Sequence, residues 1–217
     1  MKILKMKSRY FFITLILAAP SFASTDVSRD FWLGTFNKVK LTSKSFLWSE
    51  TQLRYNVEDS EMGQTLIRGG LLRKIGKKNQ EVGLLYAFIQ SGVNKEHRLA
   101  LQHTMRYSES VNLSHRVRLE YRALENQKPL DERFRYLFRY QSLKKRGLGL
   151  PVIWDEVFVN LDKKPNDKID YLDRNRLFIG FRSKFEEFNF EYGYLNQYAP
   201  REGQSVMDHT LVAYLFF

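Results

Sequence analysis

Charged and apolar residues alternate along the stretch HRVRLEYRAL, residues 115–124. Arg116, Arg118, Glu120 and Arg122 occupy every second position, and such residues share one face of an extended strand. A guanidinium group donates hydrogen bonds in a fixed fork, and a carboxylate accepts them. The predicted chemistry of this face is therefore electrostatic: a hydrated ion-pair network that acts as a plug, a pore lining or a binding site.

Two other stretches repeat this design. EHRLALQHTMRY (96–107) and ERFRYLFRYQ (132–141) also carry charged residues on one face and mostly apolar residues on the other. The charged candidates in them are Glu96, Arg98, Arg106, Arg133, Arg135 and Arg139. If these faces meet, acids or water must separate the arginines, and Glu96, Glu120 and Glu156 are the natural partners.

The remaining polar residues offer little for catalysis or metal binding. Ser114 and His115 are adjacent on a predicted strand, so their side chains diverge, whereas a nucleophile and its base need hydrogen-bond contact. The four histidines form no compact ligand motif, and the chain has no cysteine. We therefore expect no metal, no cofactor and no catalytic residue. The sequence favours a protein that is not an enzyme without deciding the question.

The first 23 residues have the pattern of a secretory signal peptide. Basic residues up to Arg9 precede the short apolar run YFFITLILAA, and we expect cleavage after Ala23. The run is shorter than the roughly 20 apolar residues that a membrane-spanning helix needs. Residues 24–217 are then one exported domain, and the lack of cysteine excludes a small disulfide scaffold. Although the net charge is +11, the basic residues are spread along the chain, so we expect no nucleic acid partner.

Alternation and turn signals dominate residues 24–217. They predict an all-β fold, an antiparallel up-and-down transmembrane β-barrel of about 10 to 12 strands. The predicted strands lie near residues 31–40, 45–57, 64–74, 80–91, 95–108, 111–124, 131–143, 151–161, 173–184, 187–198 and 206–217. Many are longer than the usual soluble strand of about 5 to 6 residues. Because bacterial single-chain barrels have an even number of strands, we expect ten or twelve.

The lengths of the connections between strands predict which end of the barrel faces the periplasm and which faces outward. Polar stretches such as NVEDSEMGQ and YAPREGQS are longer than KIGKKNQ and SKFEE, as expected for long loops at one end and short turns at the other. SLKKRGLGLP is the exception, because it is longer than this rule predicts for a short turn.

The end of the chain helps to decide which face of the strands points inward. It reads HTLVAYLFF, with apolar residues at alternate positions before Phe217, as in the last strands of outer-membrane barrels. We therefore interpret Phe217 as a signal for the barrel-assembly machinery. Arginine on the lipid-facing side costs about 2–4 kcal/mol at the middle of the bilayer, so the charged faces are predicted to line the lumen.

Several stretches in combination resemble the Gram-negative exported proteins grouped as domain-of-unknown-function family 2490. They are EHRLALQ (96–102), RVRLEYR (116–122), RFRY (133–136), DEVFVNL (155–161), DRNRLFIGF (173–181) and GYLNQY (193–198). The resemblance implies an outer-membrane barrel and carries no established activity. The candidates for a lumen network that it implies are Arg116, Arg118, Glu120, Arg122, Arg133, Arg135, Glu156, Asn160, Asn175 and Arg176.

The sequence thus predicts an outer-membrane β-barrel of a Gram-negative bacterium. Its role is either that of a narrow, porin-like channel or that of a barrel that binds anionic small solutes or other ligands in an Arg- and Glu-rich lumen. Outer-membrane lipid and the assembly machinery are the expected partners. Two alternatives stay open: an outer-membrane enzyme acting on lipid or lipopolysaccharide, and a soluble periplasmic, lipocalin-like binding barrel with its charged faces outside.

Overall fold

The computed structural model describes residues 25–76, 79–107, 112–125, 130–162, 171–201 and 204–217, so the predicted signal peptide lies outside the described residues. These residues form eleven β-strands. The strands are β1 (Thr25–Lys40), β2 (Ser45–Asn56), β3 (Glu61–Ile75), β4 (Gln80–Ser91), β5 (Asn94–Arg106), β6 (Leu113–Leu124), β7 (Asp131–Gln141), β8 (Leu150–Asn160), β9 (Leu172–Lys184), β10 (Asn189–Arg201) and β11 (Gln204–Phe216). No helix in this part of the chain is long and apolar enough to cross a membrane.

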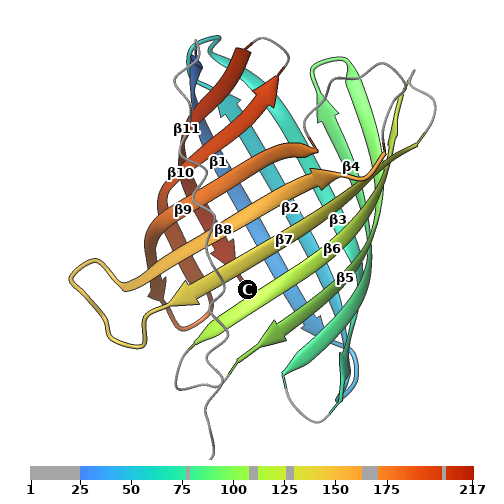
Figure 1. The fold of residues 1–217 in the computed structure, drawn as a ribbon. Helices are drawn as coiled ribbons and strands as arrows, with labels where there is room; N and C mark the ends of the chain where they lie inside the picture. Colours follow the sequence, from blue (N-terminus) through green and yellow to red (C-terminus); the bar gives the residue numbers. More distant parts are fainter. Residues whose placement is uncertain (1–24, 77–78, 108–111, 126–129, 163–170, 202–203) are drawn as a thin grey trace, which may run out of the picture.

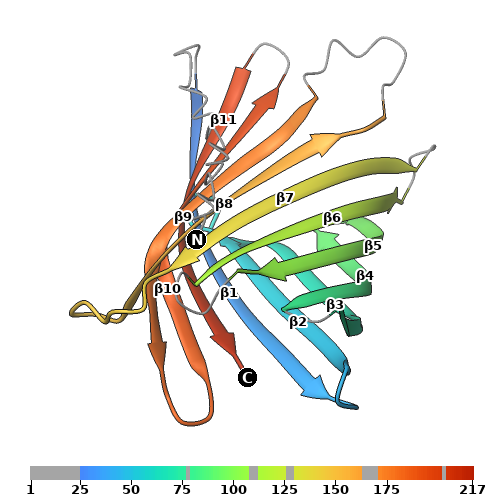
Figure 2. The ribbon, with the colours of Figure 1, turned by 60° about the horizontal axis from the view of Figure 1, so that its bottom comes forward.

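The strands follow one another around a single closed barrel, as Figures 1 and 2 show. Each strand pairs antiparallel with the next, but the closing pair, β1 with β11, is parallel from Thr25↔Ser205 to Phe36↔Phe216. The predicted all-β barrel of about 10 to 12 strands is confirmed. The expectation of an even number is wrong, because one parallel pair allows an odd number of strands to close.

The predicted strands agree with the structure to within a few residues, except at the beginning. The first strand was expected near residue 31, but β1 begins at Thr25. Residues 25–30 are mostly polar and give a weak strand signal, yet they pair with β11 along one edge. Hydrogen bonds to a distant strand therefore determine this boundary, and local sequence does not reveal it.

The expected contrast between a long-loop end and a short-turn end does not match the strand bounds. YAPREGQS, predicted as a loop, lies mostly within β10 and β11, which pair as far as Arg201↔Gln204. At the opposite end of the barrel, residues 142–149 form one of the longer connections. Loop length therefore gives no orientation for this barrel.

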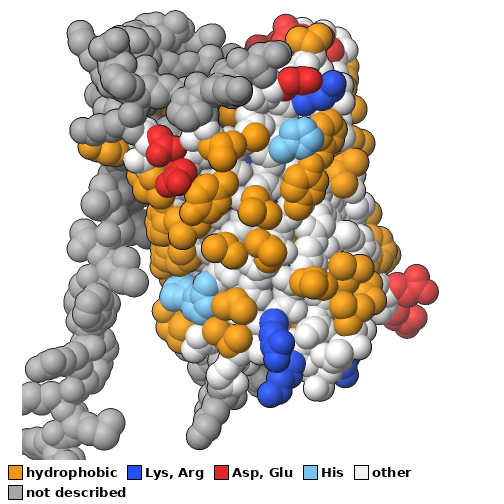
Figure 3. All heavy atoms as spheres, turned by 90° about the vertical axis from the view of Figure 1, so that its right-hand side faces the viewer, with side chains coloured by type: hydrophobic (Ala, Val, Ile, Leu, Met, Phe, Trp, Pro, Cys, Tyr) orange, Lys and Arg blue, Asp and Glu red, His pale blue; other side chains and the backbone are white. Residues whose placement is uncertain are grey.

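Each strand turns one face to the barrel interior and the other to the outside. Arg118 and Glu120 are 2% and 1% exposed, whereas Leu119 between them is 38% exposed. The same alternation leaves Leu33, Leu53, Leu71, Leu84, Leu101, Ile153, Ile179 and Leu211 exposed on the outside. Figure 3 shows one side of this surface, where hydrophobic side chains are spread over the middle of the barrel and charged ones lie mainly near the two ends. The alternative with the charged faces outside is therefore wrong.

Two glycines face each other where β9 and β10 approach closely. Gly180 and Gly193 are register partners. A Cβ atom on Gly193 would lie 2.4 Å from the carbonyl oxygen of Ile179 and 2.6 Å from the Cα of Gly180. Such contacts would force the two strands apart. Gly69 on β3 is different, because a Cβ there would meet only the carbonyl oxygen of Trp48, at 3.8 Å.

We expect Gly193→Ala to lower the free energy of unfolding by about 1–3 kcal/mol, because the added methyl group overpacks the β9–β10 contact. Urea unfolding of the refolded protein, followed by tryptophan fluorescence, measures the change. Gly69→Ala is the matched control and should shift the free energy by no more than about 0.5 kcal/mol. Equal stability of the two variants would contradict the close approach of β9 and β10.

Candidate lumen site

All eleven strands contribute side chains to a cavity inside the barrel. Its volume is about 460 Å³, which falls within the roughly 300–1,000 Å³ of typical small-molecule sites. Its wall combines a network of charged side chains with a group of aromatic ones.

Glu120 on β6 lies at the centre of the charged network. Its Oε2 accepts a hydrogen bond of 2.7 Å from Arg133 Nη2, and its Oε1 accepts one of 2.6 Å from Arg135 Nη1. The Nη1 atoms of Arg98 and Arg118 lie 3.6 and 3.7 Å from the same carboxylate. One buried carboxylate therefore holds together four guanidinium groups from β5, β6 and β7.

A second buried carboxylate extends the network to β8. Glu156 Oε1 accepts hydrogen bonds from Arg135 Nη2 at 2.8 Å and from Arg116 Nη2 at 3.0 Å. Arg135 thus bridges Glu120 and Glu156. Charge-assisted hydrogen bonds are stronger in a low-dielectric interior than in water, so this chain of contacts fixes β6, β7 and β8 relative to one another.

Five other acidic residues of the lumen are also paired with cations. The ion pairs are Glu96 with Arg98 and Arg122, Glu191 with Arg139 and Arg182, Asp173 with Arg133 and Arg174, Glu81 with Lys38 and Arg106, and Glu50 with Arg68. Cations are nevertheless in excess. Among the described residues, the cavity wall holds thirteen Lys and Arg side chains but only five Glu side chains. Such an excess needs water or anions to compensate it.

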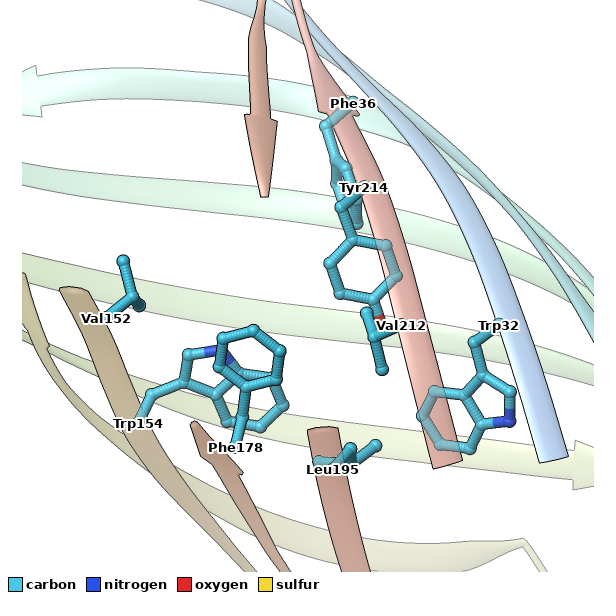
Figure 4. Close-up of a cluster of buried hydrophobic side chains, with 8 residues drawn as sticks. All are labelled: Trp32, Phe36, Val152, Trp154, Phe178, Leu195, Val212 and Tyr214. Carbon is cyan, nitrogen blue, oxygen red and sulfur yellow. The ribbon is translucent and has the colours of Figure 1, made fainter. Parts of the chain in front are cut away.

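A cluster of eight apolar side chains, five of them aromatic, covers the inner face of β1 and β8 to β11. Figure 4 shows its members, Trp32, Phe36, Val152, Trp154, Phe178, Leu195, Val212 and Tyr214. The rings of Trp154 and Phe178 stack with centroids 5.1 Å apart, and Phe36 meets Tyr214 edge-on at the same separation. The lumen is therefore partly an apolar core and partly a charged network.

Most of the predicted lumen residues come together in the structure. Those that line the cavity are Glu96, Arg98, Arg106, Arg116, Arg122, Arg133, Arg135, Arg139, Glu156 and Arg176. Arg118 and Glu120 are buried within the network, and Asn160 shares the inner face of β8 with Glu156 by alternation.

Asn175 does not belong to the network, in contrast to the prediction. Its Nδ2 donates a 2.8 Å hydrogen bond to Asp155 Oδ1 on the outer face, because Arg174 and Arg176 on either side take the inward positions.

The backbone amide of Phe217, the predicted assembly signal, donates a 2.9 Å hydrogen bond to the backbone carbonyl of Phe36. Its role in assembly stays a prediction.

The histidines are engaged mainly with tyrosines. His97 Nδ1 lies 2.6 Å from the hydroxyl oxygen of Tyr86, His115 Nδ1 lies 3.3 Å from that of Tyr107, and His209 contacts Tyr194 in the same way. In the described ranges, no group of three or more His, Cys, Asp or Glu residues is placed to hold a metal ion.

Residues 29–208 match a protein family described as "Protein of unknown function (DUF2490)". The chain belongs to this family. The DUF2490 match begins within β1 and ends within β11, so it includes every strand of the charged network. Comparisons with curated proteins and with solved structures found no match.

Several lumen residues of this DUF2490 protein carry only a weak sequence signal. Glu50 and Arg68 form a buried ion pair of 2.8 Å, and Glu191 binds two arginines. The alternation of Trp48, Glu50, Gln52 and Arg54 in WSETQLR could have indicated a lumen face. Arg68 and Glu191 are single charges in mostly apolar stretches, so no repeated pattern marks them.

We expect Glu120→Gln to lower the free energy of unfolding by about 3–5 kcal/mol, because four guanidinium groups would lose their shared carboxylate. Urea unfolding measures this loss. Glu125→Gln is the matched control: its ion pair with Lys95 is 3.7 Å long and both side chains are 47% exposed, so a change below about 1 kcal/mol is expected. A Glu120→Gln variant as stable as this control would contradict the central position of Glu120.

Proposed function

We propose that this DUF2490 protein is an outer-membrane β-barrel whose cationic lumen binds anionic solutes. The excess of Lys and Arg over Glu around the cavity, thirteen against five among the described residues, carries the proposal. Guanidinium groups favour anions through their charge and through paired hydrogen bonds. The lumen therefore attracts negatively charged solutes and repels cations.

The outer surface supports a place in a membrane. Aliphatic side chains are exposed on most strands, and tyrosines such as Tyr86, Tyr121 and Tyr194 are exposed among them. Large apolar surfaces are rare on soluble monomers. A closed barrel also pairs its backbone groups between strands, as a lipid environment requires.

The N-terminal sequence supports the outer membrane in particular. Residues 1–23 have the pattern of a secretory signal peptide, and exported single-chain barrels of bacteria are outer-membrane proteins. Outer-membrane lipid and the barrel-assembly machinery are then the partners of this protein.

We expect Leu119→Arg to block membrane insertion, because arginine on the lipid face costs about 2–4 kcal/mol near the bilayer midplane. The measurement is the fraction of protein in washed outer membranes that migrates faster on gels when it is not boiled. Val93→Arg is the control, because Val93 is 90% exposed in the turn between β4 and β5. If both variants assemble equally well, the outer face does not contact lipid.

Calorimetric titration of the protein in lipid nanodiscs with inorganic pyrophosphate tests the function of the lumen. We expect binding that weakens as KCl is added, since salt screens exposed charges. Empty nanodiscs give the background, and spermidine, a polycation, is the matched solute that should not bind. Absence of pyrophosphate binding, or equally tight binding of spermidine, would overturn the proposal.

A further inference from the structure

Two lumen arginines differ from the others. Among the described residues, Arg54 on β2 and Arg176 on β9 form no ion pair with a carboxylate, whereas every other arginine of the cavity wall forms one. Arg54 Nη2 donates a 3.2 Å hydrogen bond to Gln52 Oε1, and its Nε is buried without a partner. Arg176 Nε donates a 2.7 Å hydrogen bond to Gln197 Oε1. Gln197 also donates to Asp208, so an amide separates that carboxylate from Arg176.

Both guanidinium groups lie against the same indole ring. The Cζ atoms of Arg54 and Arg176 are 4.0 and 4.9 Å from the centre of the Trp32 ring, and the two positive charges repel each other. A cation–π contact offsets only part of the cost of burying a charge. Asp30, on the same face of β1 as Trp32, interacts with Arg54 electrostatically but forms no ion pair with it. An acidic group placed against both guanidinium groups would neutralise them and supply the missing hydrogen-bond acceptors.

An apolar wall leads away from this pair along β1 and β11. Trp32 and Phe36 share the inner face of β1 and are four residues apart, which corresponds to about 13 Å in an extended strand. Phe36 packs against Tyr214 at 5.1 Å and against Phe216 at 4.7 Å between ring centroids. All four residues line the same cavity as the arginines. Figure 4 shows Trp32, Tyr214 and Phe36 in succession along this wall.

We propose that the cavity binds an organic anion with one acidic head and an apolar body, of the class of medium-chain carboxylates. The head contacts Arg54 and Arg176, and the body lies along Trp32, Tyr214 and Phe36. An inorganic anion would satisfy the arginines but would leave the aromatic wall in contact with water. This inference rests on the proposed function, because it names the class of anion for the same lumen.

Titration of the nanodisc-embedded protein with decanoate and with acetate tests the inference, because the two ligands share a head group and differ only in the apolar body. After subtraction of empty nanodiscs, we expect decanoate to bind at least about tenfold more tightly than acetate, since each buried methylene adds to affinity. Decanoate that binds no more tightly than acetate overturns the inference. This comparison uses the unmodified chain and holds even if a variant fails to fold.

Variants then locate the head group. We expect Arg54→Gln and Arg176→Gln each to weaken decanoate binding about tenfold or more, by loss of a charge-assisted hydrogen bond. Arg106→Gln is the matched control, because it removes one lumen charge from the Arg106–Glu81 pair and leaves Arg54 and Arg176 in place. Equal losses in all three variants overturn the assigned head-group site.

Pyrophosphate titrated into the same samples separates the two proposals. If pyrophosphate binds but decanoate is no better than acetate, this inference fails and the proposed function stands; if neither anion binds, the proposed function fails. Nanodiscs with and without phosphatidylglycerol distinguish a free amphiphile from a membrane lipid as the source. If phosphatidylglycerol weakens decanoate binding, the site belongs to a membrane lipid. If decanoate binds equally well in both kinds of nanodisc, the site belongs to the free anion. Both outcomes support an amphipathic anion.

Discussion

The fold depends on burying an excess of positive charge inside a closed sheet. Glu120 and Glu156 each hold several guanidinium groups, and Arg135 joins the two carboxylates across β6, β7 and β8. Such a network is stable only if every strand turns its charged residues to the same side. The period-two alternation achieves this, and it places Leu119 and its apolar neighbours on the outside. One pattern thus determines both the chemistry of the lumen and the nature of the outer surface.

Closure of the sheet involves the same residues. If all neighbouring strands were antiparallel, the first and last would need to run in opposite directions, which requires an even number. Here β1 is antiparallel to β2 and parallel to β11, so eleven strands leave no open edge. The seam also contributes to the cavity, because β1 provides Trp32 and Phe36 and β11 provides Tyr214. The strand pair that closes the barrel therefore also carries the aromatic side chains of the cavity wall.

The sequence predicted much of this arrangement, and the failures have physical causes. The alternation in RVRLEYR and RFRY identifies strands and lumen faces because side-chain direction is a local property. The parallel partner of β1 and the start of β1 at Thr25 depend on a strand far away in the chain. Asn175 was misplaced because a match to a family motif does not show which face of the strand a residue occupies. Its neighbours Arg174 and Arg176 point into the lumen, so Asn175 between them points outward. Arg54 was missed because nothing in WSETQLR shows that its partner on the neighbouring strand is Trp32 rather than an acid.

The chain has no cysteine, so a single spin label can be placed at any position. The most direct test of the account is the accessibility of labels at Leu101 and Leu119 on the outer face and at Gln102 on the lumen face, in reconstituted vesicles. If the apolar faces contact lipid, oxygen, which concentrates in lipid, relaxes the labels at 101 and 119, while a water-soluble nickel complex relaxes the label at 102. Preferential relaxation of the outer labels by nickel would contradict it, because these side chains would then face water.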